Sequence, residues 1–439
     1  MKDLIKTHKL NNDQGVDLDK LDDTQAAAVT STDEKVVLRA PAGSGKTTTI
    51  INAVVQYRYE NLNDRICAIT YTRAARAEME ARLQEYGIYD VEVTTIHVWA
   101  RNLLHDFSIK YDFKIKILEE PQIKAILQDI INDYSKKMRS AKTMNVNIVY
   151  SFVTGNKNME VSDRYRSTLM ALERRYVAYK RMMGLYDFTD YPLYLYDVLV
   201  AYNETINNID ALFIDEFQDV DSVQFKIFEK VLCKKKFAVG DPWQSIFVFR
   251  GADGEVFEKT ADFTEYKLKY NYRSYQEIID YAATVYCTLV DDVKRDDEVY
   301  ISMITEKEDS NIVCIRGEGG FVYVVDPYGR CFRFHKDKRD RVAIDLAMDD
   351  LLSRRPMILC RTNKQVAAIN ALGYFECSTV HQAKGLEYDN VIVIDTTINS
   401  LESLNVAYVA LTRAKNRVLV INWAQFEGLF EQKKNIWDK

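Results

Sequence analysis

One short stretch decides the fold: residues 36–50 read Val36-Val-Leu-Arg-Ala-Pro-Ala-Gly-Ser-Gly-Lys-Thr-Thr-Thr-Ile50. An apolar strand leads into a glycine-rich turn, and a helix-compatible run follows, which is the order of a phosphate-binding P-loop. Glycines let successive backbone N–H groups turn inward around phosphate oxygens. Lys46 would reach the β- and γ-phosphates, and the Thr47 hydroxyl would be a Mg²⁺ ligand. The candidate nucleotide-binding residues here are Ala42, Gly43, Ser44, Gly45, Lys46, Thr47 and Thr48. A chance glycine-rich turn is the alternative, but the strand and helix around it argue against that reading.

A second element adds carboxylates to the same predicted sheet. The residues 211–214 are apolar, and Asp215 and Glu216 follow directly. An acid at the carboxyl end of a strand can hold the water shell of a metal, and a neighbouring acid can orient the attacking water. We therefore assign Asp215 to Mg²⁺ and Glu216 to catalysis. The alternative, a solvated acidic turn, is weakened by the P-loop upstream.

The alternation of β-rich and helical runs predicts the domain organisation. Residues 35–95, 211–240 and 356–421 alternate such runs in the manner of parallel α/β sheets, whereas residues 118–202 carry apolar side chains at helical spacing. Two glycine-containing turns between β-prone runs indicate a small antiparallel hairpin. The predicted domains are a first lobe at 1–104 and 188–266, a helical insertion at 105–187, and a second lobe at 267–439 with the hairpin near 313–334.

The composition excludes several classes of protein. The chain has 439 residues, of which 47% are hydrophobic and 28% charged, as in a soluble globular protein. No apolar run approaches the roughly 18 residues that span a bilayer, and the start of the chain lacks the apolar segment of a signal peptide. The seven scattered cysteines and five histidines lack the spacing of disulfide frameworks or zinc sites. A net charge of -6 argues against bulk coating of nucleic acid but permits a local basic groove, since charges are screened over about 8 Å.

Eight further blocks follow one another along the chain. They are Leu21-Asp-Asp-Thr-Gln25, Thr70-Tyr-Thr-Arg-Ala-Ala-Arg-Ala-Glu78-Met79, Thr95-Ile-His97, Asp187-Phe188-Thr-Asp190, residues 239–252, Leu268-Lys-Tyr-Asn271-Tyr272-Arg273-Ser274, Thr379-Val-His381-Gln-Ala-Lys384-Gly385-Leu386-Glu387 and Tyr408-Val-Ala-Leu-Thr412-Arg413-Ala414. Their order and spacing resemble those of superfamily 1 DNA helicases of the UvrD/Rep type. Arg73 and Ala74 depart from the family pattern, where an Asn and a Lys are usual. The resemblance implies an α/β fold with two RecA-like P-loop lobes, parallel sheets and a helical insertion in the first lobe.

The resemblance also implies catalytic roles around the transferring phosphate. Gln244 would hydrogen-bond the γ-phosphate from the first lobe. Arg273 and Arg413 would act as arginine fingers from the second lobe and spread the charge of the transferring phosphoryl group. With Glu216 these residues form the predicted catalytic set. The alternative for each arginine is a surface salt bridge.

Four more residues are nucleotide-binding candidates by the same resemblance. Gln25 would read adenine, Tyr272 would stack on it, and Glu387 would hold the ribose, with Gly385 close by. ATP and Mg²⁺ are the implied cofactors.

Two phenylalanines lead the candidates for DNA binding. Phe247 and Phe249 alternate with Val248, so both rings would face the same way in an extended segment, and Arg250 follows. Stacking of a base on an aromatic ring contributes about 1–3 kcal/mol whatever the base, which suits a protein that must hold every base in turn. The alternative is a pair of core phenylalanines. The full set of DNA candidates is Tyr71, Thr72, His97, Phe247, Phe249, Arg250, Arg361, Asn363 and His381.

The implied function is that of an ATP-dependent DNA helicase or translocase. It would move 3′ to 5′ on single-stranded DNA and couple hydrolysis at the lobe interface to stepping and duplex unwinding. Only a short stretch separates Asn363 from Thr379, which leaves no room for the large regulatory insertion of the family, and no strand-separating hairpin is recognised after Arg413. Translocation is therefore expected more firmly than processive unwinding. The alternatives are a DNA-stimulated ATPase that acts as a loader or switch, and a P-loop ATPase with a small-molecule substrate.

The expected partners are single-stranded DNA and junctions between single strand and duplex, with proteins of replication, repair or recombination as further candidates. We expect a cytoplasmic protein, associated with the nucleoid or acting in a host cytoplasm if viral. It would make no membrane contact and would be monomeric or weakly self-associating.

Overall fold

The computed structural model describes residues 15–138, 141, 144–154, 163–247, 251–287, 301–302, 312–314, 321–325, 331–335, 355–373, 375–394 and 400–421. The chain divides into two compact units. The first comprises Met1–Leu38, Thr47–Gly240 and Arg250–Tyr266, and the second comprises Arg39–Lys46, Asp241–Phe249 and Lys267–Lys439. Most of the P-loop and the segment that carries Gln244 therefore group with the later part of the chain. The predicted domain boundaries, which place both segments in the first lobe, stay predictions.

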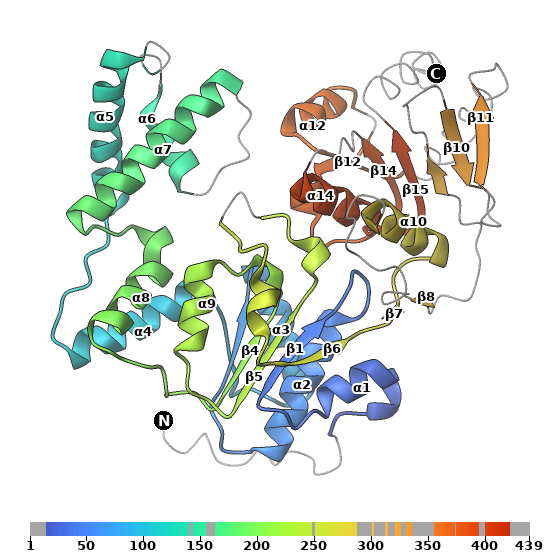
Figure 1. The fold of residues 1–439 in the computed structure, drawn as a ribbon, viewed down its shortest axis with the longest axis horizontal. Coiled ribbons are helices and arrows are strands. Elements are labelled where there is room, and N and C mark those ends of the chain that lie inside the picture. The colour runs from blue at the N-terminus through green and yellow to red at the C-terminus, as the bar shows by residue number, and fades with distance from the viewer. Residues whose placement is uncertain are drawn as a thin grey trace. The chain divides into compact units, whose positions relative to one another are not determined.

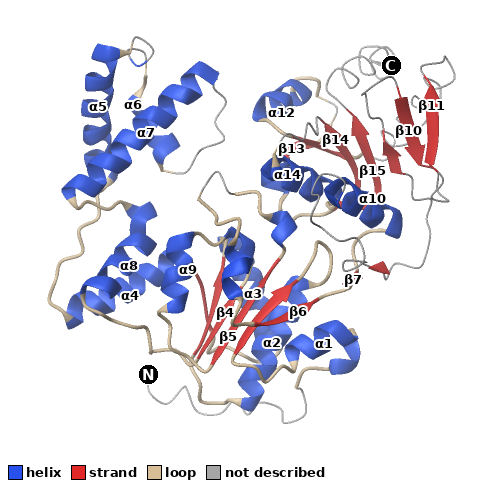
Figure 2. Ribbon diagram, in the orientation of Figure 1, coloured by secondary structure: helices blue, strands red, loops and turns tan. Residues whose placement is uncertain are grey.

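The first unit is built on a six-stranded sheet in the order β3-β2-β4-β5-β1-β6 (Figure 1; Figure 2). Its strands are β1 (Lys35–Arg39), β2 (Ile66–Thr70), β3 (Glu92–Thr95), β4 (Ala211–Ile214), β5 (Lys235–Gly240) and β6 (Thr264–Lys267). Strand β2 pairs in parallel with β3 and β4, and β4 pairs in parallel with β5. Every residue of β2 and β4 is buried, as in parallel sheets covered on both faces. The predicted parallel α/β sheet is confirmed.

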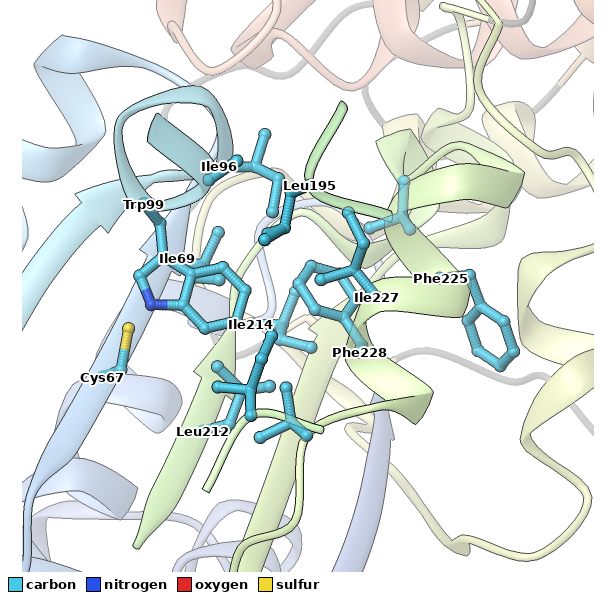
Figure 3. Packing of buried hydrophobic residues seen from close by; sticks show 14 of the residues in the cluster. Cys67, Ile69, Ile96, Trp99, Leu195, Leu212, Ile214, Phe225, Ile227 and Phe228 are labelled. Carbon is cyan, nitrogen blue, oxygen red and sulfur yellow. The ribbon is translucent and has the colours of Figure 1, made fainter. Parts of the chain in front are cut away.

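Helices α4, α8 and α9 pack on this sheet. The helices of the first unit are α1 (Asp23–Val29), α2 (Lys46–Glu60), α3 (Arg73–Glu85), α4 (Ile96–Lys110), α5 (Glu120–Lys137), α6 (Val146–Val153), α7 (Asp163–Met183), α8 (Tyr191–Ala201) and α9 (Ser222–Glu229). Trp99, Leu195 and Phe228 from these three helices form one buried cluster with Leu212 and Ile214 of β4 (Figure 3). Each such side chain contributes about 1.5–3 kcal/mol on burial. The cluster fixes the carboxyl end of β4, where Asp215 and Glu216 follow.

Helices α5, α6 and α7 have a hydrophobic core of their own. Ile123 and Leu127 of α5, Val149 of α6, and Leu172 and Tyr176 of α7 are buried together. The apolar residues of α5 recur at helical spacing, and Gln122 completes a capping box at its start. Within the region predicted to be helical from its spacing, α5, α6 and α7 therefore form a separate bundle, whereas α8 packs on the sheet.

A buried charged cluster joins this bundle to the next segment of the first unit. The Lys180 ammonium group lies 2.8 Å from Asp187 Oδ2 and also pairs with Asp190, and the Tyr176 hydroxyl donates to Asp187 Oδ2 at 2.9 Å. Burial raises the pKa of Asp187, but the Lys180 charge and hydrogen bonds from Lys180 and Thr189 outweigh it, so the net pKa is lowered. Burial and the nearby Asp187 charge raise the pKa of Asp190. A helix of the bundle thus supplies one cation to the two carboxylates of the block that starts at Asp187.

The second unit contains a seven-stranded mixed sheet in the order β11-β10-β9-β15-β14-β12-β13. Its strands are β9 (Ile312–Cys314), β10 (Phe321–Val325), β11 (Cys331–His335), β12 (Met357–Cys360), β13 (Cys377–Thr379), β14 (Tyr388–Ile394) and β15 (Ala414–Ile421). The neighbours from β9 to β13 pair in parallel, whereas β10 pairs antiparallel with β9 and β11. A two-stranded sheet pairs β7 (Tyr270–Asn271) with β8 (Ile301–Ser302). The helices are α10 (Gln276–Cys287), α12 (Asn363–Asn370), α13 (Val380–Ala383) and α14 (Leu401–Leu411).

Within the residues that the structure describes, no helix combines the length and apolarity that a bilayer crossing requires.

Candidate nucleotide site

The P-loop has the backbone shape that phosphate binding needs. Gly43 and Gly45 adopt left-handed conformations, with φ of 76° and 79°. The Ser44 N–H and hydroxyl both donate to the Pro41 carbonyl, at 3.1 Å and 2.7 Å, which closes the turn. Helix α2 then begins at Lys46, so its first N–H groups face the loop. These residues fit a nucleotide phosphate.

Residues after β6 pack directly against this loop in the second unit. Asn271 Nδ2 donates to the Ala42 carbonyl at 2.6 Å, and the Tyr272 N–H donates to the Gly43 carbonyl at 2.8 Å. A Cβ atom built on Gly43 would lie 2.8 Å from Arg273 Cβ and 2.8 Å from Asn271 Nδ2. Only glycine fits this contact, because both the positive φ and the close approach exclude a side chain.

We expect Gly43→Ala to lower the free energy of unfolding by about 1–3 kcal/mol more than Gly87→Ala, the cost of overpacking a tight contact. Gly87 is the matched control because its φ of 74° is similar but open space surrounds it. Chemical denaturation measures the difference, and binding of a fluorescent ATP analogue should weaken only in Gly43→Ala. Equal losses in both variants would contradict the packing argument.

Arg413 is buried, and its guanidinium contacts the Gln244 side chain within the second unit. Its Nη2 donates to Gln244 Oε1 at 3.2 Å, and its Nε donates to the Val409 carbonyl at 2.9 Å. Its Nη1 donates to the Leu386 carbonyl at 3.2 Å. Side chain and backbone partners therefore hold the guanidinium in one place, as a preorganised electrostatic group requires.

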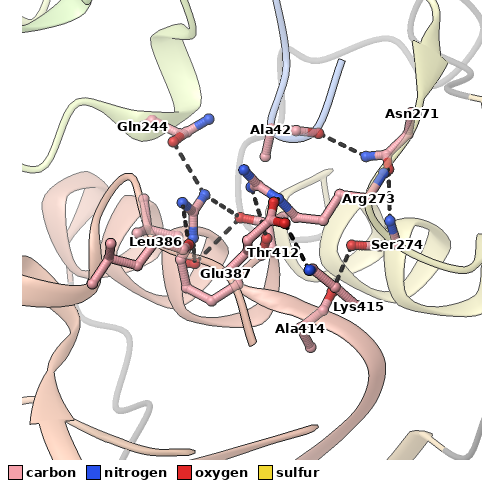
Figure 4. Close-up of polar contacts among 12 residues, drawn as sticks. Ala42, Gln244, Asn271, Arg273, Ser274, Leu386, Glu387, Thr412, Ala414 and Lys415 are labelled. Carbon is pink, nitrogen blue, oxygen red and sulfur yellow. Dashed lines mark hydrogen bonds and ion pairs between the residues drawn. The ribbon is translucent and has the colours of Figure 1, made fainter. Parts of the chain in front are cut away.

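Arg273 and Glu387, predicted separately, form an ion pair. Arg273 Nε lies 2.8 Å from Glu387 Oε2, and Lys415 Nζ lies 2.8 Å from Glu387 Oε1 (Figure 4). Partial burial raises the pKa of Glu387, but hydrogen bonds from Lys415 and Arg273 outweigh it and lower the net pKa. The carboxylate stays charged at neutral pH between two cations. Arg273 Nη1 also donates to the Thr412 carbonyl at 3.2 Å.

The Gln244 segment is held through its backbone as well as its side chain. Gln244 Nε2 donates to Asp241 Oδ2 at 2.7 Å, and Lys384 Nζ donates to the Gln244 carbonyl at 3.0 Å. Phe247 is buried, with Lys384 Nζ 4.8 Å from its ring centroid and the His381 ring 6.1 Å away. In this conformation Phe247 has the surroundings of a core residue. Phe249 and Arg250 lie outside the described residues.

The predicted metal and water acids lie at the end of β4 in the first unit. Asp215 is buried, and its Oδ1 accepts the Glu216 N–H at 2.8 Å. Glu216 has a left-handed backbone, with φ of 50° and ψ of 44°, and its Oε2 accepts a hydrogen bond from Gln218. A non-glycine residue in this region is strained, and such strain is concentrated at functional sites. A Cβ on Gly240 would lie 2.4 Å from Gln218 Oε1, so β5 also crowds this turn.

Four other nucleotide-binding candidates, Gln25, Thr48, Tyr272 and Gly385, have different surroundings. Gln25 is buried, and its Oε1 accepts the Asp22 N–H at 3.3 Å in the capping box of α1. Thr48 Oγ1 accepts a hydrogen bond from Arg82 Nη2 at 3.0 Å. The Tyr272 side chain is exposed, as base stacking requires, and Gly385 has a φ of 88°.

The DNA candidates that the structure describes, Phe247 apart, follow the carboxyl ends of parallel strands. In the first unit, Tyr71 and Thr72 follow β2, and His97 lies in the first turn of α4 after β3. In the second unit, Arg361 and Asn363 follow β12, and His381 lies in α13 after β13. Strands β2 and β3 are neighbours, as are β12 and β13. In open α/β sheets this edge is where ligands bind.

Two sequence comparisons bear on the family. Residues 21–264 match the family model described as the UvrD/REP helicase N-terminal domain, and residues 374–421 match that of the UvrD-like helicase C-terminal domain. The chain belongs to the UvrD/REP helicase family. The predicted resemblance is confirmed, and the two units with parallel strands agree with the two RecA-like lobes of a UvrD-type helicase.

Several curated proteins are similar to this UvrD/REP family chain. A "Probable DNA helicase II homolog" of Mycoplasma capricolum is 28% identical over 60% of this chain and 40% of its own length. A "Probable DNA helicase" of Mycoplasma pneumoniae is 25% identical over 92% of this chain and 84% of its own length. "Gabija protein GajB" of Bacillus cereus is 25% identical over 88% of this chain and 92% of its own length. The chain thus spans less than half of the first relative and most of the other two.

Sequence reasoning left four contact residues of this UvrD/REP site without a role. Asn271 and Lys384 stand inside quoted blocks, and Lys415 follows the last block directly. Asn405 stands outside every block, but it lies three residues before Tyr408 and so shares a face of α14 with it. Helical spacing from Tyr408 was the available signal for Asn405.

Proposed function

We propose that this chain is an ATP-dependent DNA helicase or translocase that moves 3′ to 5′ along single-stranded DNA. The contact between Arg413 and Gln244 carries the proposal, because it joins a predicted arginine finger to the residue predicted to reach the γ-phosphate. The same unit holds the glycine turns of the P-loop against Asn271. Membership of the UvrD/REP family supports the assignment.

The nucleotide would be held by residues on the P-loop and β4. Lys46 and the loop N–H groups would bind the phosphates, and Thr47 and Asp215 would hold Mg²⁺. Bound Mg²⁺ would offset the phosphate charge. Glu216 would accept a proton from the attacking water.

Gln244 would transmit the state of the nucleotide. Gln244 Oε1 accepts from Arg413, and Gln244 Nε2 donates to Asp241. A γ-phosphate would compete with Oε1 for Arg413 and with Asp241 for the Nε2 donor, and so would shift the segment. Asp241–Phe249 leads from Gln244 towards the predicted DNA residues 249 and 250. Movement of this segment between two positions would change the contacts that residues 249 and 250 make with DNA.

A forked duplex with one labelled strand tests the proposal. We expect ATP-dependent release of the labelled strand by the natural chain and none by Lys46→Ala, which loses the cation that binds the β- and γ-phosphates. Lys20→Ala, at an exposed surface position, is the matched lysine control. Duplexes with a single 3′ or 5′ tail determine polarity, and release from the 5′-tailed duplex alone would contradict the proposed direction.

Two other outcomes separate the alternatives. DNA-stimulated hydrolysis without strand release would favour the translocase, loader or switch. Absence of DNA stimulation would refute every nucleic-acid function and favour a P-loop ATPase with another substrate.

A further inference from the structure

Helix α14 and Arg413, two residues after its end, contact three consecutive residues of the Gln244 segment. The Trp243 and Tyr408 rings meet edge to face with centroids 5.2 Å apart. Arg413 donates to the Gln244 side chain at 3.2 Å, and Asn405 Nδ2 donates to the Ser245 carbonyl at 2.8 Å. Helix α14 therefore contacts residues 243 and 245, and Arg413, just after the helix, contacts residue 244.

Asn405 is the member of this group without an assigned role. Its side chain is 4% exposed, and its Oδ1 has no hydrogen-bond partner among the described residues. A buried amide oxygen without a partner costs stability, so packing alone would favour an apolar residue here. The bond from Nδ2 to the Ser245 carbonyl is what the asparagine adds.

This bond fixes the segment rather than a particular side chain. A carbonyl oxygen is present whatever residue stands at position 245, and Ser245 is itself buried. Holding the carbonyl sets the position of the preceding residue along α14, and with it the distance from Gln244 Oε1 to Arg413 Nη2. Loss of the bond lets the segment slide relative to the guanidinium.

We propose that Asn405 is a positioning residue that sets the Gln244 segment against Arg413 for hydrolysis. The inference rests on the proposed function for its catalytic part. Its structural part, that Asn405 restrains residues 243–247, holds with or without DNA.

The test uses Asn405→Leu, which removes the donor and keeps the number and branching of side-chain heavy atoms. Asn405→Ala cannot overpack, so it serves if the leucine variant fails to fold. Asn61→Leu is the matched control, because Asn61 Nδ2 also donates to a backbone carbonyl, that of Tyr57, at 3.1 Å, and lies outside the site. Hydrogen exchange of peptides covering 243–247 should become about two- to tenfold faster in both Asn405 variants, the factor expected for one lost hydrogen bond. Exchange unchanged from the natural chain would overturn the proposal.

Steady-state ATP hydrolysis distinguishes a positioning role of Asn405 from a purely structural one. We expect kcat in both Asn405 variants to fall about tenfold, while KM for ATP and the affinity for a non-hydrolysable ATP analogue change by less than about twofold, the pattern of an interaction used only in the transition state. Unchanged kcat with faster exchange would overturn the positioning role, as would equal losses in Asn61→Leu. If the natural chain shows no DNA stimulation, the proposed function fails, and exchange with basal hydrolysis still decides the role of Asn405.

Discussion

Replacing Arg413 with alanine is expected to lower the DNA-stimulated rate of ATP hydrolysis by about three orders of magnitude, the lower end of the range for arginine fingers. The guanidinium is buried against Gln244 and anchored by the Val409 and Leu386 carbonyls, so it stabilises charge without reorganising. Nucleotide affinity should be largely kept, because the P-loop binds the phosphates. Single-turnover hydrolysis and analogue binding measure the two quantities.

Burial makes a control essential, because Arg413→Ala also leaves carbonyl groups without a donor. Arg413→Lys keeps the charge but loses the planar fork of donors, so it should fold better and still hydrolyse slowly. Arg58→Lys is the matched control: Arg58 is buried and donates to the carbonyls of Asn61, Leu62 and Asp64. It should lose stability without losing hydrolysis. Near-natural hydrolysis by Arg413→Lys, or an equal loss in Arg58→Lys, would refute the assignment.

The second large effect concerns folding. Lys180→Ala should lower the free energy of unfolding by about 3–5 kcal/mol, the cost of leaving buried charges without their partner. Asp187 and Asp190 would then lie close together without Lys180, and Tyr176 and Thr189 would remain as donors to Asp187. Urea denaturation followed by circular dichroism measures the loss.

Lys136→Ala is the control in the same helical bundle. Lys136 is exposed, and its ammonium group forms a long surface ion pair with Asp133, at 3.9 Å. Its removal should lower the free energy of unfolding by about 0.5 kcal/mol or less. Similar losses of unfolding free energy in the two variants would show that the buried cluster does not hold the bundle to the rest of the first unit.

Local chemistry made much of the fold predictable. Glycine spacing located the P-loop, and the apolar run 66–70 coincides with β2. Strands β14 and β15 extend further than their apolar residues indicate, because Tyr388 pairs with Ala414 and Asn390 with Arg417 at their starts. Polar residues at a strand start carry no apolar signal, so composition alone shortens such strands.

Long-range pairing could not be predicted from local pattern. Arg273 and Glu387 are 114 positions apart, and nothing in either block indicates that they meet. Lys180 stands in a helix rich in charge, where a lysine indicates a solvated face, yet it is buried against two acids. Phe247 alternates with Val248 and Phe249 in a pattern that suits base stacking, but tertiary packing buries its side chain.

A threonine and a histidine occupy the same positions at the start of one helix in each unit. In each unit a threonine, Thr95 or Thr379, ends a strand and starts a helix, and a histidine, His97 or His381, is the second helical residue. Parallel strands have distinguishable ends, and in both units the threonine and the histidine lie at the carboxyl end of such a strand, β3 beside β2 or β13 beside β12. If His97 and His381 both contact DNA, as predicted, each unit presents that contact at the same end of its parallel strands.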